Sequence, residues 1–389
     1  MRIGLICLVL GYALSQFYRA FLPVLTPDLR ADLGATPDDL ALASGLWFIV
    51  FAAMQIPVGA ALDRIGPRRT TGLLFALGGA GGAALLALAQ TPLHVTLAMM
   101  LIAVGCSPVL MASYFILARM YPPAAFGTLA GLVIGLGTFG NIAGSAPLAW
   151  AATAFGWRAT LWGVAAVTLV IAALLMATIK DPPREAGGAR GSVLDLLRIP
   201  ALWPILALMF VNYAPAAAIR GLWAGPYTSD VLGGDQRLIG MVTLVMGLAM
   251  IAGSFAYGPM ERLFGTRKWV IFLGNLGGAL GCIAFWLFDI RALVPAAALF
   301  ALIGFCGASF PLIAAHARAY FPAHLTGRGV TLVNLFGIGG VGAAQLASGP
   351  VFGLAQGAGD GAYVILFGLF GLLLLAGLAA YLMSRDRTD

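Results

Sequence analysis

Charged residues are scarce in this sequence. Of its 389 residues, only 10% are charged and 61% are hydrophobic, and the mean hydropathy is +0.97. A soluble globular domain carries about a quarter charged residues, so this composition excludes a water-soluble fold. The formal charge of +7 does not indicate a nucleic-acid site, because the basic residues form no continuous stripe. We therefore expect a membrane protein with no nucleic-acid partner.

Cysteine is also sparse. The four cysteines, Cys7, Cys106, Cys282 and Cys306, all fall in apolar runs and form neither a disulfide framework nor a CxxC metal motif. The sequence also lacks a catalytic nucleophile constellation, a cluster of metal ligands and a phosphate-binding loop. We therefore expect no enzyme activity and no cofactor.

Long apolar runs are what the sequence does contain. A bilayer core of ~30 Å needs about 20 apolar residues per helix, and runs this evenly apolar are typical of helices rather than barrel strands. The first nineteen residues imitate a signal peptide, but the internal repeat described below favours a first span there. The predicted fold class is an all-α membrane protein of twelve transmembrane helices in two six-helix bundles. The predicted spans lie near residues 4–25, 39–61, 71–90, 93–117, 127–152, 158–179, 203–226, 237–257, 269–288, 292–316, 329–353 and 361–383.

The longest polar stretch, from Lys180 to Arg198, separates six spans from six. It predicts an N-terminal bundle over 1–180, a cytoplasmic linker over 181–200 and a C-terminal bundle over 201–389. With an even number of spans both termini share one side, which would hold sixteen of the 22 basic residues, against four on the other side. This imbalance places both termini in the cytoplasm of a protein of the bacterial inner membrane.

The two halves repeat each other. An offset of 200 pairs Cys106 with Cys306 and Gly140 with Gly340, and an offset of 199 pairs the Arg68-Arg69 dipeptide with Arg267-Lys268. Parallel repeats of this kind place a solute site between the halves near the bilayer midplane, opened alternately to each side. The architecture therefore predicts a secondary or facilitative transporter that works by alternating access.

The loop after the second predicted span carries a recognisable motif. Residues 59–69 read GAALDRIGPRR, which resembles the signature between the second and third helices of the major facilitator superfamily, and residues 258–268 look like a degenerate copy. With the spans, linker and repeat, the resemblance covers essentially the whole chain. It implies a rocker-switch transporter whose loop charges hold the outward-open state closed on the cytoplasmic side, with Gly59 allowing close helix approach. The gating residues implied are Gly59, Asp63, Arg64, Arg68, Glu261, Arg262 and Arg267.

Two family elements are missing. Residues 97–104 are apolar where many proton-coupled members carry an arginine in the fourth helix, and the GPxxGG element of antiporters survives in the fifth helix only as glycine spacing. Drug/proton antiport therefore loses support.

Every acidic residue falls in a loop, at the end of a predicted span or in a tail, whereas two basic residues lie inside the spans. Arg19 in the first span and Arg220 in the seventh are related by an offset of 201, as are Tyr12 and Tyr213. The spacing of seven between tyrosine and arginine predicts that both lie on one helix face. Charges inside a membrane are costly, so these arginines are candidate functional residues.

Two guanidiniums without an acidic partner repel each other in a low dielectric, and an anion relieves that repulsion. The pair resembles organophosphate/phosphate antiporters, in which arginines of the first and seventh helices clasp the anion, and organic-anion symporters with an arginine in the first helix. We expect a monomer in the lipid bilayer that moves a small anionic solute such as an organic or phosphate-like anion. The alternative is that both arginines snorkel to the outer headgroups. The predicted substrate-binding residues are Arg19, Arg220, Tyr12, Tyr213, Gln16, Trp223, Asn141 and Asn334.

Other interpretations stay open at this point. Interhelical hydrogen bonds compete with substrate contact for Asn141 and Asn334, and His316 is either an interfacial histidine or a group that couples protons. Met246 and Met250, with Cys106 and Cys306 in other spans, would suit a copper(I) importer, although the HxxxM partner is absent. A non-transporting sensor or assembly factor of the same fold is a further alternative, disfavoured because no signalling domain is present in this sequence.

Overall fold

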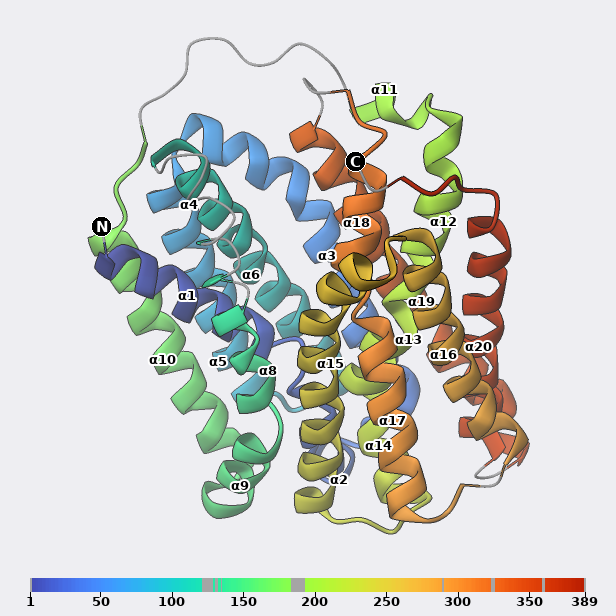
Figure 1. Cartoon of the computed structure of the whole chain (residues 1–389). Helices are drawn as coiled ribbons and strands as arrows, with labels where there is room; N and C mark the ends of the chain where they lie inside the picture. Colours follow the sequence, from blue (N-terminus) through green and yellow to red (C-terminus); the bar gives the residue numbers. More distant parts are fainter. Residues whose placement is uncertain are drawn as a thin grey trace. The chain divides into compact units, whose positions relative to one another are not determined.

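The structure is a computed structural model that describes residues 2–120, 129, 132–133, 135–182, 193–288, 290–322, 326–358 and 361–387. Within those ranges the chain is helical and contains no strand (Figure 1). Ten helices are long and apolar enough to cross a membrane, and an eleventh span arises if α1 and α2 count together. The predicted all-α membrane fold is therefore confirmed. Part of the predicted fifth span, near 127–152, lies outside the described residues.

The chain divides into two compact units. Unit 1 comprises residues 1–186 together with the short segment Gln236–Met241, and unit 2 comprises Gly187–Asp235 and Val242–Asp389. Half of the predicted linker over 181–200, residues 183–192, lies outside the described residues.

Unit 1 is built around the long helices α3 and α6, which pack along each other. Thr36 begins α3 with a capping box, in which its hydroxyl accepts from the Asp39 amide while the Asp39 carboxylate accepts from the Thr36 amide. Gly156, at φ 81°, allows the sharp turn between α9 and α10. The helices are α1 (Arg2–Phe17), α2 (Leu22–Leu33), α3 (Pro37–Arg64), α4 (Pro67–Leu74), the π-helix η1 (Phe75–Ala80), α5 (Gly81–Ala87), α6 (Pro92–Met120), α8 (Phe139–Ala143), α9 (Ala146–Phe155) and α10 (Trp157–Thr178).

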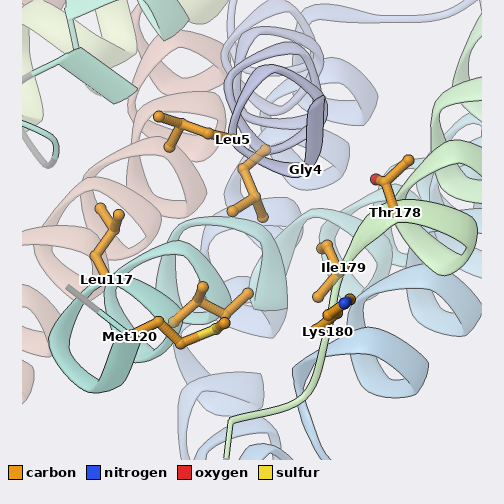
Figure 2. A pocket seen from close by; sticks show the side chains of 9 residues that line it. Gly4, Leu5, Leu117, Met120, Thr178, Ile179 and Lys180 are labelled. Atoms are coloured by element: carbon orange, nitrogen blue, oxygen red, sulfur yellow. The ribbon is translucent and has the colours of Figure 1, made fainter. Parts of the chain in front are cut away.

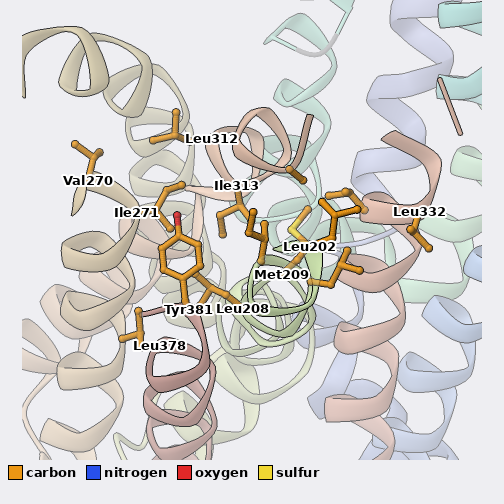
Figure 3. Close-up of a cluster of buried hydrophobic side chains, with 14 of the residues drawn as sticks. Leu202, Leu208, Met209, Val270, Ile271, Leu312, Ile313, Leu332, Leu378 and Tyr381 are labelled. Carbon is orange, nitrogen blue, oxygen red and sulfur yellow. The ribbon is translucent and has the colours of Figure 1, made fainter. Parts of the chain in front are cut away.

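Unit 2 contains most of the second half of the chain. Its helix α20 packs against both α12 and α16. They enclose a core in which Met209, Ile271 and Tyr381 are fully buried (Figure 3). The elements are α11 (Val193–Leu197), η2 (Pro200–Leu202), α12 (Trp203–Asn212), α13 (Ala214–Ala218), the π-helix η3 (Ile219–Trp223), α14 (Ala224–Asp230), α15 (Gln236–Phe264), α16 (Lys268–Leu287), α17 (Leu293–Gly307), α18 (Phe310–Arg318), α19 (Thr326–Ala355), η5 (Gln356–Ala358) and α20 (Gly361–Tyr381).

Several predicted spans are interrupted helices. The first bends by 49° between α1 and α2, and this second segment carries the helix to Leu33. Asp28 and Asp32, expected in a loop, therefore lie on α2, where Asp32 pairs with Arg158 at 2.6 Å. The seventh span runs through α12, α13, η3 and α14, and the tenth breaks between α17 and α18. Interruptions free backbone groups and are tolerated in membranes only where other protein groups or water satisfy them.

Candidate functional site

Arg19 lies in the turn between α1 and α2 of unit 1, not within a regular helix. Its guanidinium carbon is 4.7 Å from the ring centre of Phe51 and 5.4 Å from that of Trp47, both buried on α3. Among the described residues, no acceptor lies within hydrogen-bonding distance of its Nε. The guanidinium therefore makes cation–π contacts with two aromatic rings, and its Nε–H can donate to another acceptor.

The residues predicted beside Arg19 lie on α1 and α8. The Tyr12 ring packs so tightly against Gly137 that a methyl group there would overlap the ring. Gln16 is buried, and its amide oxygen has no hydrogen-bond donor among the residues that the structure describes. Asn141 is half-buried on α8.

Arg220 lies in the π-helix η3 of unit 2 and is 4% exposed. Its terminal Nη2 is 3.0 Å from the position that a Cβ would occupy at Gly247, on α15. The missing side chain at Gly247 therefore makes room for the guanidinium. π-Helical turns of this kind occur frequently at functional sites.

The other predicted residues of unit 2 occupy different environments. Tyr213 forms the break between α12 and α13, with its ring 6.1 Å from that of Phe310. Trp223 is fully buried, and its indole donates to the Ser348 hydroxyl on α19 at 2.9 Å. Asn334 is half-buried on α19. Trp223 is thus engaged inside its own unit.

The spacing argument behind the tyrosine and arginine pairs assumed continuous α-helices. The structure instead places Arg19 beyond the end of α1 and puts a helix break and a π-helix between Tyr213 and Arg220. A spacing of seven therefore does not by itself bring either pair to one face, because the angular step per residue changes at each interruption.

The motif loop of unit 1 is organised by Asp181, which follows α10. Its carboxylate accepts from the backbone amide of Arg68, at the first turn of α4, at 2.8 Å. Gly66 adopts φ 102°, and a Cβ there would lie 2.7 Å from the same carboxylate. The Arg68 side chain donates from Nε to the Met176 carbonyl at 2.5 Å. Gly66 and Asp181 together cap α4 and tie it to the end of α10.

The other predicted gating residues of unit 1 are Gly59, Asp63 and Arg64. A Cβ at Gly59 would lie 3.7 Å from the Met111 methyl group, an ordinary contact, so the close helix approach expected at this glycine is not observed. Arg64 is exposed. The side chain of Asp63 lies outside the described part of the chain.

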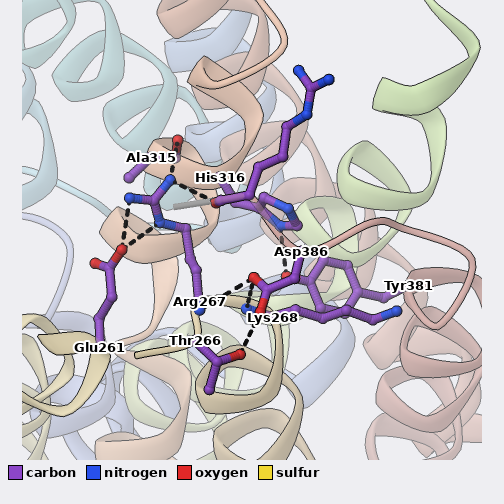
Figure 4. A network of polar contacts seen from close by, with 9 residues as sticks. Glu261, Thr266, Arg267, Lys268, Ala315, His316, Tyr381 and Asp386 are labelled. Carbon is purple, nitrogen blue, oxygen red and sulfur yellow. Dashed lines mark hydrogen bonds and ion pairs between the residues drawn. The ribbon is translucent and has the colours of Figure 1, made fainter. Parts of the chain in front are cut away.

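Unit 2 carries a denser network at the corresponding place (Figure 4). Glu261 and Arg267 form an ion pair of 2.6 Å, with side chains only 20% and 11% exposed. Arg267 also donates to the carbonyls of Ala315 and Arg387, at 3.3 Å and 3.0 Å. Arg262, predicted to share this role, is exposed.

Asp386 in unit 2 corresponds to Asp181 in unit 1. Its carboxylate accepts from the Lys268 amide at 2.9 Å, the Arg267 amide at 3.3 Å and the Thr266 hydroxyl at 2.5 Å. Partial burial raises the pKa of Asp386, but these hydrogen bonds outweigh burial and leave its pKa below the ordinary value.

His316 joins the same network from α18. Fully buried, it lies 2.7 Å from the Tyr381 hydroxyl and 2.9 Å from the Arg385 carbonyl. The Nε2–H tautomer fits both contacts, since a carbonyl can only accept. The expectation of a snorkelling interfacial side chain is therefore wrong, because these two partners satisfy the ring inside the unit.

Sequence reasoning missed Asp181 and Asp386. Both follow the last helix of their half and both come directly after a basic residue, in Lys180-Asp181 and Arg385-Asp386. That shared dipeptide was a usable signal. Which helix end each carboxylate caps depends on tertiary packing.

The residues considered for copper pack as ordinary interior side chains. Met246 and Met250 lie against the backbone of Gly304 on α17, and the Cys306 sulfur lies against Gly277 on α16. In the described part of the chain, no three His, Cys, Asp or Glu side chains lie together in a way that could hold a metal ion.

Unit 1 also holds a mainly apolar pocket between the first turn of α1, the end of α6 and the end of α10 (Figure 2). Leu8, Leu117 and Met120 form its wall, and Lys180 stands among the lining residues. Its polar side chains are those of Thr178 and Lys180, and none of the predicted substrate-binding residues lines it.

Comparison with known proteins identifies the family. The model of the Major Facilitator Superfamily matches residues 8–235. An uncharacterized transporter, YybO of Bacillus subtilis, is 23% identical over 228 residues, covering 56% of this chain and 52% of that protein. The methyl viologen resistance protein SmvA of Salmonella typhimurium is 28% identical over 235 residues, covering 58% and 45%. The matches span about half the length of these relatives.

Solved structures share the fold across nearly the whole chain. The crystal structure of a D-xylose-proton symporter aligns with a TM-score of 0.78 at 16% identity, covering 98% of this chain and 97% of that one. The nucleoside transporter NupG, as a D323A mutant, aligns with a TM-score of 0.77 at 13% identity, covering 98% and 99%. At these identities the likeness shows the fold alone. The chain is a multi-pass membrane protein that belongs to the major facilitator superfamily of transporters.

Proposed function

We propose that this transporter moves a small anionic solute and that Arg19 and Arg220 bind the anion. The observation that carries the proposal is the setting of Arg19. Two aromatic rings hold its guanidinium at a helix break, and no acceptor among the described residues occupies its Nε. A carboxylate or phosphate oxygen is the acceptor that a guanidinium fork fits best.

Arg220 supports the same proposal from the other half of the repeat. It is buried in a π-helix against Gly247, in a span whose carboxylate, Asp230, lies ten residues away at the end of α14. A guanidinium carries five N–H donors in a planar fork, which suits a carboxylate or phosphate. Arg19 and Arg220 are related by the repeat offset of 201, so each half carries an arginine at the corresponding position.

In this proposal the cytoplasmic side is the one that carries both termini and the two motif networks. The Asp181 cap of α4 and the Glu261–Arg267 pair then stabilise the motif loops of the two units while the transporter alternates between its states. Because the acidic residues of the candidate spans, Asp28 and Asp32 on α2 among them, lie toward the ends of those spans, we infer exchange or facilitated movement rather than proton symport.

The test is a binding and transport screen of the purified protein. Thermal unfolding in detergent is measured with organic acids, phosphate esters, inorganic anions, sugars, nucleosides and organic cations, and hits are assayed by counterflow in liposomes. We expect stabilisation by one class of anion, and counterflow of that anion that is lost in Arg19→Gln and Arg220→Gln. Arg198→Gln is the matched control, because that side chain is 85% exposed. Stabilisation by cations or neutral solutes alone would contradict the anion proposal.

A further inference from the structure

A small cavity lies inside unit 2, where α12, α16, α17 and α20 meet. Its lining includes Asn212, Asn275, Cys306 and Gly307. It offers about 10 Å³ to the centre of a water-sized sphere, which is near the least that holds one water molecule. A bare sodium ion is smaller than a water molecule. The cavity is therefore matched in size to a single small ligand.

The polar side chains at this cavity leave one oxygen unsatisfied. The Asn212 amide nitrogen donates to Asn275 Oδ1 at 2.5 Å and to Ser309 Oγ at 2.8 Å, and the Asn275 amide nitrogen donates to Ser309 Oγ at 3.1 Å and to the Ile271 carbonyl at 2.8 Å. Asn212 is 99% buried, since its exposure is 1%, and in the described part of the chain no donor reaches its Oδ1.

The amide orientations follow from this network. Exchanging the oxygen and nitrogen of Asn212 alone would bring two amide oxygens to 2.5 Å. Exchanging both amides would set the Asn275 oxygen against the Ile271 carbonyl at 2.8 Å. The unsatisfied group is therefore an oxygen, which needs an electropositive ligand.

Two helix breaks bring further oxygens to the cavity. Helix α12 ends at Asn212 and α17 ends at Gly307, and both residues line the cavity. Pro311 has no N–H to donate to the Gly307 carbonyl one turn earlier. The C-terminal ends of helices carry partial negative charge, and in transporters such ends and unwound carbonyls coordinate sodium.

Unit 1 lacks this polar cluster. At the repeat offsets of 201, 199 and 200, the counterparts of Asn212, Asn275 and Ser309 are Gly11, Ala76 and Val109. A Cβ at Gly11 would lie 3.3 Å from a Val109 methyl group, so that region is closed by apolar packing. The fold does not require the asparagines, so their presence in one half calls for another explanation.

We propose that this cavity binds a sodium ion. Its protein ligands are Asn212 Oδ1, the Gly307 carbonyl and the Cys306 carbonyl, which also accepts from the Tyr257 hydroxyl at 3.0 Å. Binding itself is independent of the proposed anion. A link between the two rests on the proposed function, since Arg220 lies eight residues beyond Asn212 in the same unit. An anion on Arg220 would offset its repulsion of the sodium ion, so each ion would bind more tightly in the presence of the other.

The test measures binding of ²²Na⁺ to the purified protein, and thermal unfolding in sodium, potassium and choline chlorides at equal ionic strength. We expect saturable ²²Na⁺ binding and a rise in Tm with sodium only. Asn212→Leu removes the unsatisfied oxygen and should weaken sodium binding by roughly 10- to 100-fold, since interactions with a charged group are among the stronger ones. Gln55→Leu is the matched control, because Gln55 is a buried amide of unit 1 that donates only to the Phe51 carbonyl of its own helix.

A second variant covers the case in which Asn212→Leu does not fold. Gly278→Ala adds a Cβ about 3.2 Å from Cys306 Cβ, which narrows the cavity and keeps the polar cluster. We expect weaker ²²Na⁺ binding in this variant too. Absence of ²²Na⁺ binding to the parent, equal stabilisation by choline or potassium, or parent-like binding in both cavity variants would overturn the site. These measurements hold chloride constant and contain no organic acid or phosphate ester, so failure of the sodium site and failure of the anion proposal are separable.

Discussion

In each unit an aspartate that follows the last helix of its half caps the helix after the motif loop, but the side chains around the two aspartates differ. In unit 1 Asp181 caps α4 through a single backbone amide and presses against Gly66, whereas in unit 2 Asp386 reaches two amides and a hydroxyl and Gly265 has open space around it. Unit 2 adds the buried Glu261–Arg267 pair. The two halves thus share a backbone arrangement at the motif loop, but the loop of unit 2 is held by more hydrogen bonds and an ion pair.

The interiors diverge further. Unit 2 holds a buried polar cluster of Asn212, Asn275 and Ser309 where unit 1 is apolar. The arginines also differ, since Arg220 is 4% exposed while Arg19 is half-buried between aromatic rings. Symmetry of the repeat therefore does not imply equal contributions from the two halves.

The largest expected effect separates the two arginines. Arg220→Gln should lower transport of the bound anion on the order of 100-fold and Arg19→Gln about tenfold, because a charge-assisted hydrogen bond is worth more in a buried site. Liposome uptake at matched protein density measures both, with Arg198→Gln as control. Equal losses would indicate a symmetric clasp.

The next effect tests the buried ion pair of unit 2. Glu261→Gln leaves Arg267 without its carboxylate, although the carbonyls of Ala315 and Arg387 still accept from it. We expect destabilisation by about 2 kcal/mol, below the cost of breaking a fully buried pair. Thermal unfolding in detergent measures it. Asp195→Asn, in an exposed pair with Arg198 at 3.8 Å, should change little, and an equally large drop there would contradict this reasoning.

Gly66 and Gly265 occupy corresponding positions in the two halves, and substituting them should change stability by a similar or smaller amount. Gly66→Ala combines an unfavourable φ of 102° with overlap on Asp181, whereas Gly265→Ala, at φ 62°, meets no neighbouring atom within 4 Å. We expect a loss of roughly 2–3 kcal/mol for Gly66→Ala and about 1 kcal/mol for Gly265→Ala. Gly59→Ala should be nearly neutral. Parallel unfolding curves of the three variants decide the ranking, which fails if Gly265→Ala costs as much as Gly66→Ala.

The smallest effect concerns the pH dependence of the unit 2 cap. The pKa of Asp386 lies below its ordinary value of 3.8 in the folded protein. Its carboxylate therefore contributes stability that is fully present above about pH 4 and is lost as the pH falls through the folded-state pKa. Asp386→Asn should lower Tm modestly at pH 7, and the difference from the parent should shrink at lower pH. A difference that stays constant down to pH 3 would exclude this role.

Much of the fold could be predicted from the sequence, since apolar runs, the basic-residue imbalance and the repeat each follow from local composition. Helix interruptions were harder to predict. The break at Arg19 carries no glycine, and the π-helix around Arg220 has no simple sequence signature. Asp28 and Asp32 were placed in a loop because hydropathy falls there, yet the helix continues through them with Arg158 as a partner for Asp32.

The candidate site was predictable only as a set of residue types. Arg19 and Arg220 stood out because charge is rare inside the spans, whereas Trp47, Phe51 and Gly247 have no distinctive composition. Trp223 was selected by spacing alone, and its indole is satisfied by Ser348 within the same unit.

The sequence by itself determined that this protein crosses the membrane, that it consists of two related halves and that it belongs to a family of transporters, because hydropathy, repeats and motifs are properties of the chain order. Only the tertiary structure decided what surrounds each polar group. In a medium without water, a buried charge or amide must find its partners across helices distant in sequence. Those partners, Asp181 for α4, Asp386 for α16 and the aromatic pair for Arg19, depend on packing geometry that no local pattern encodes.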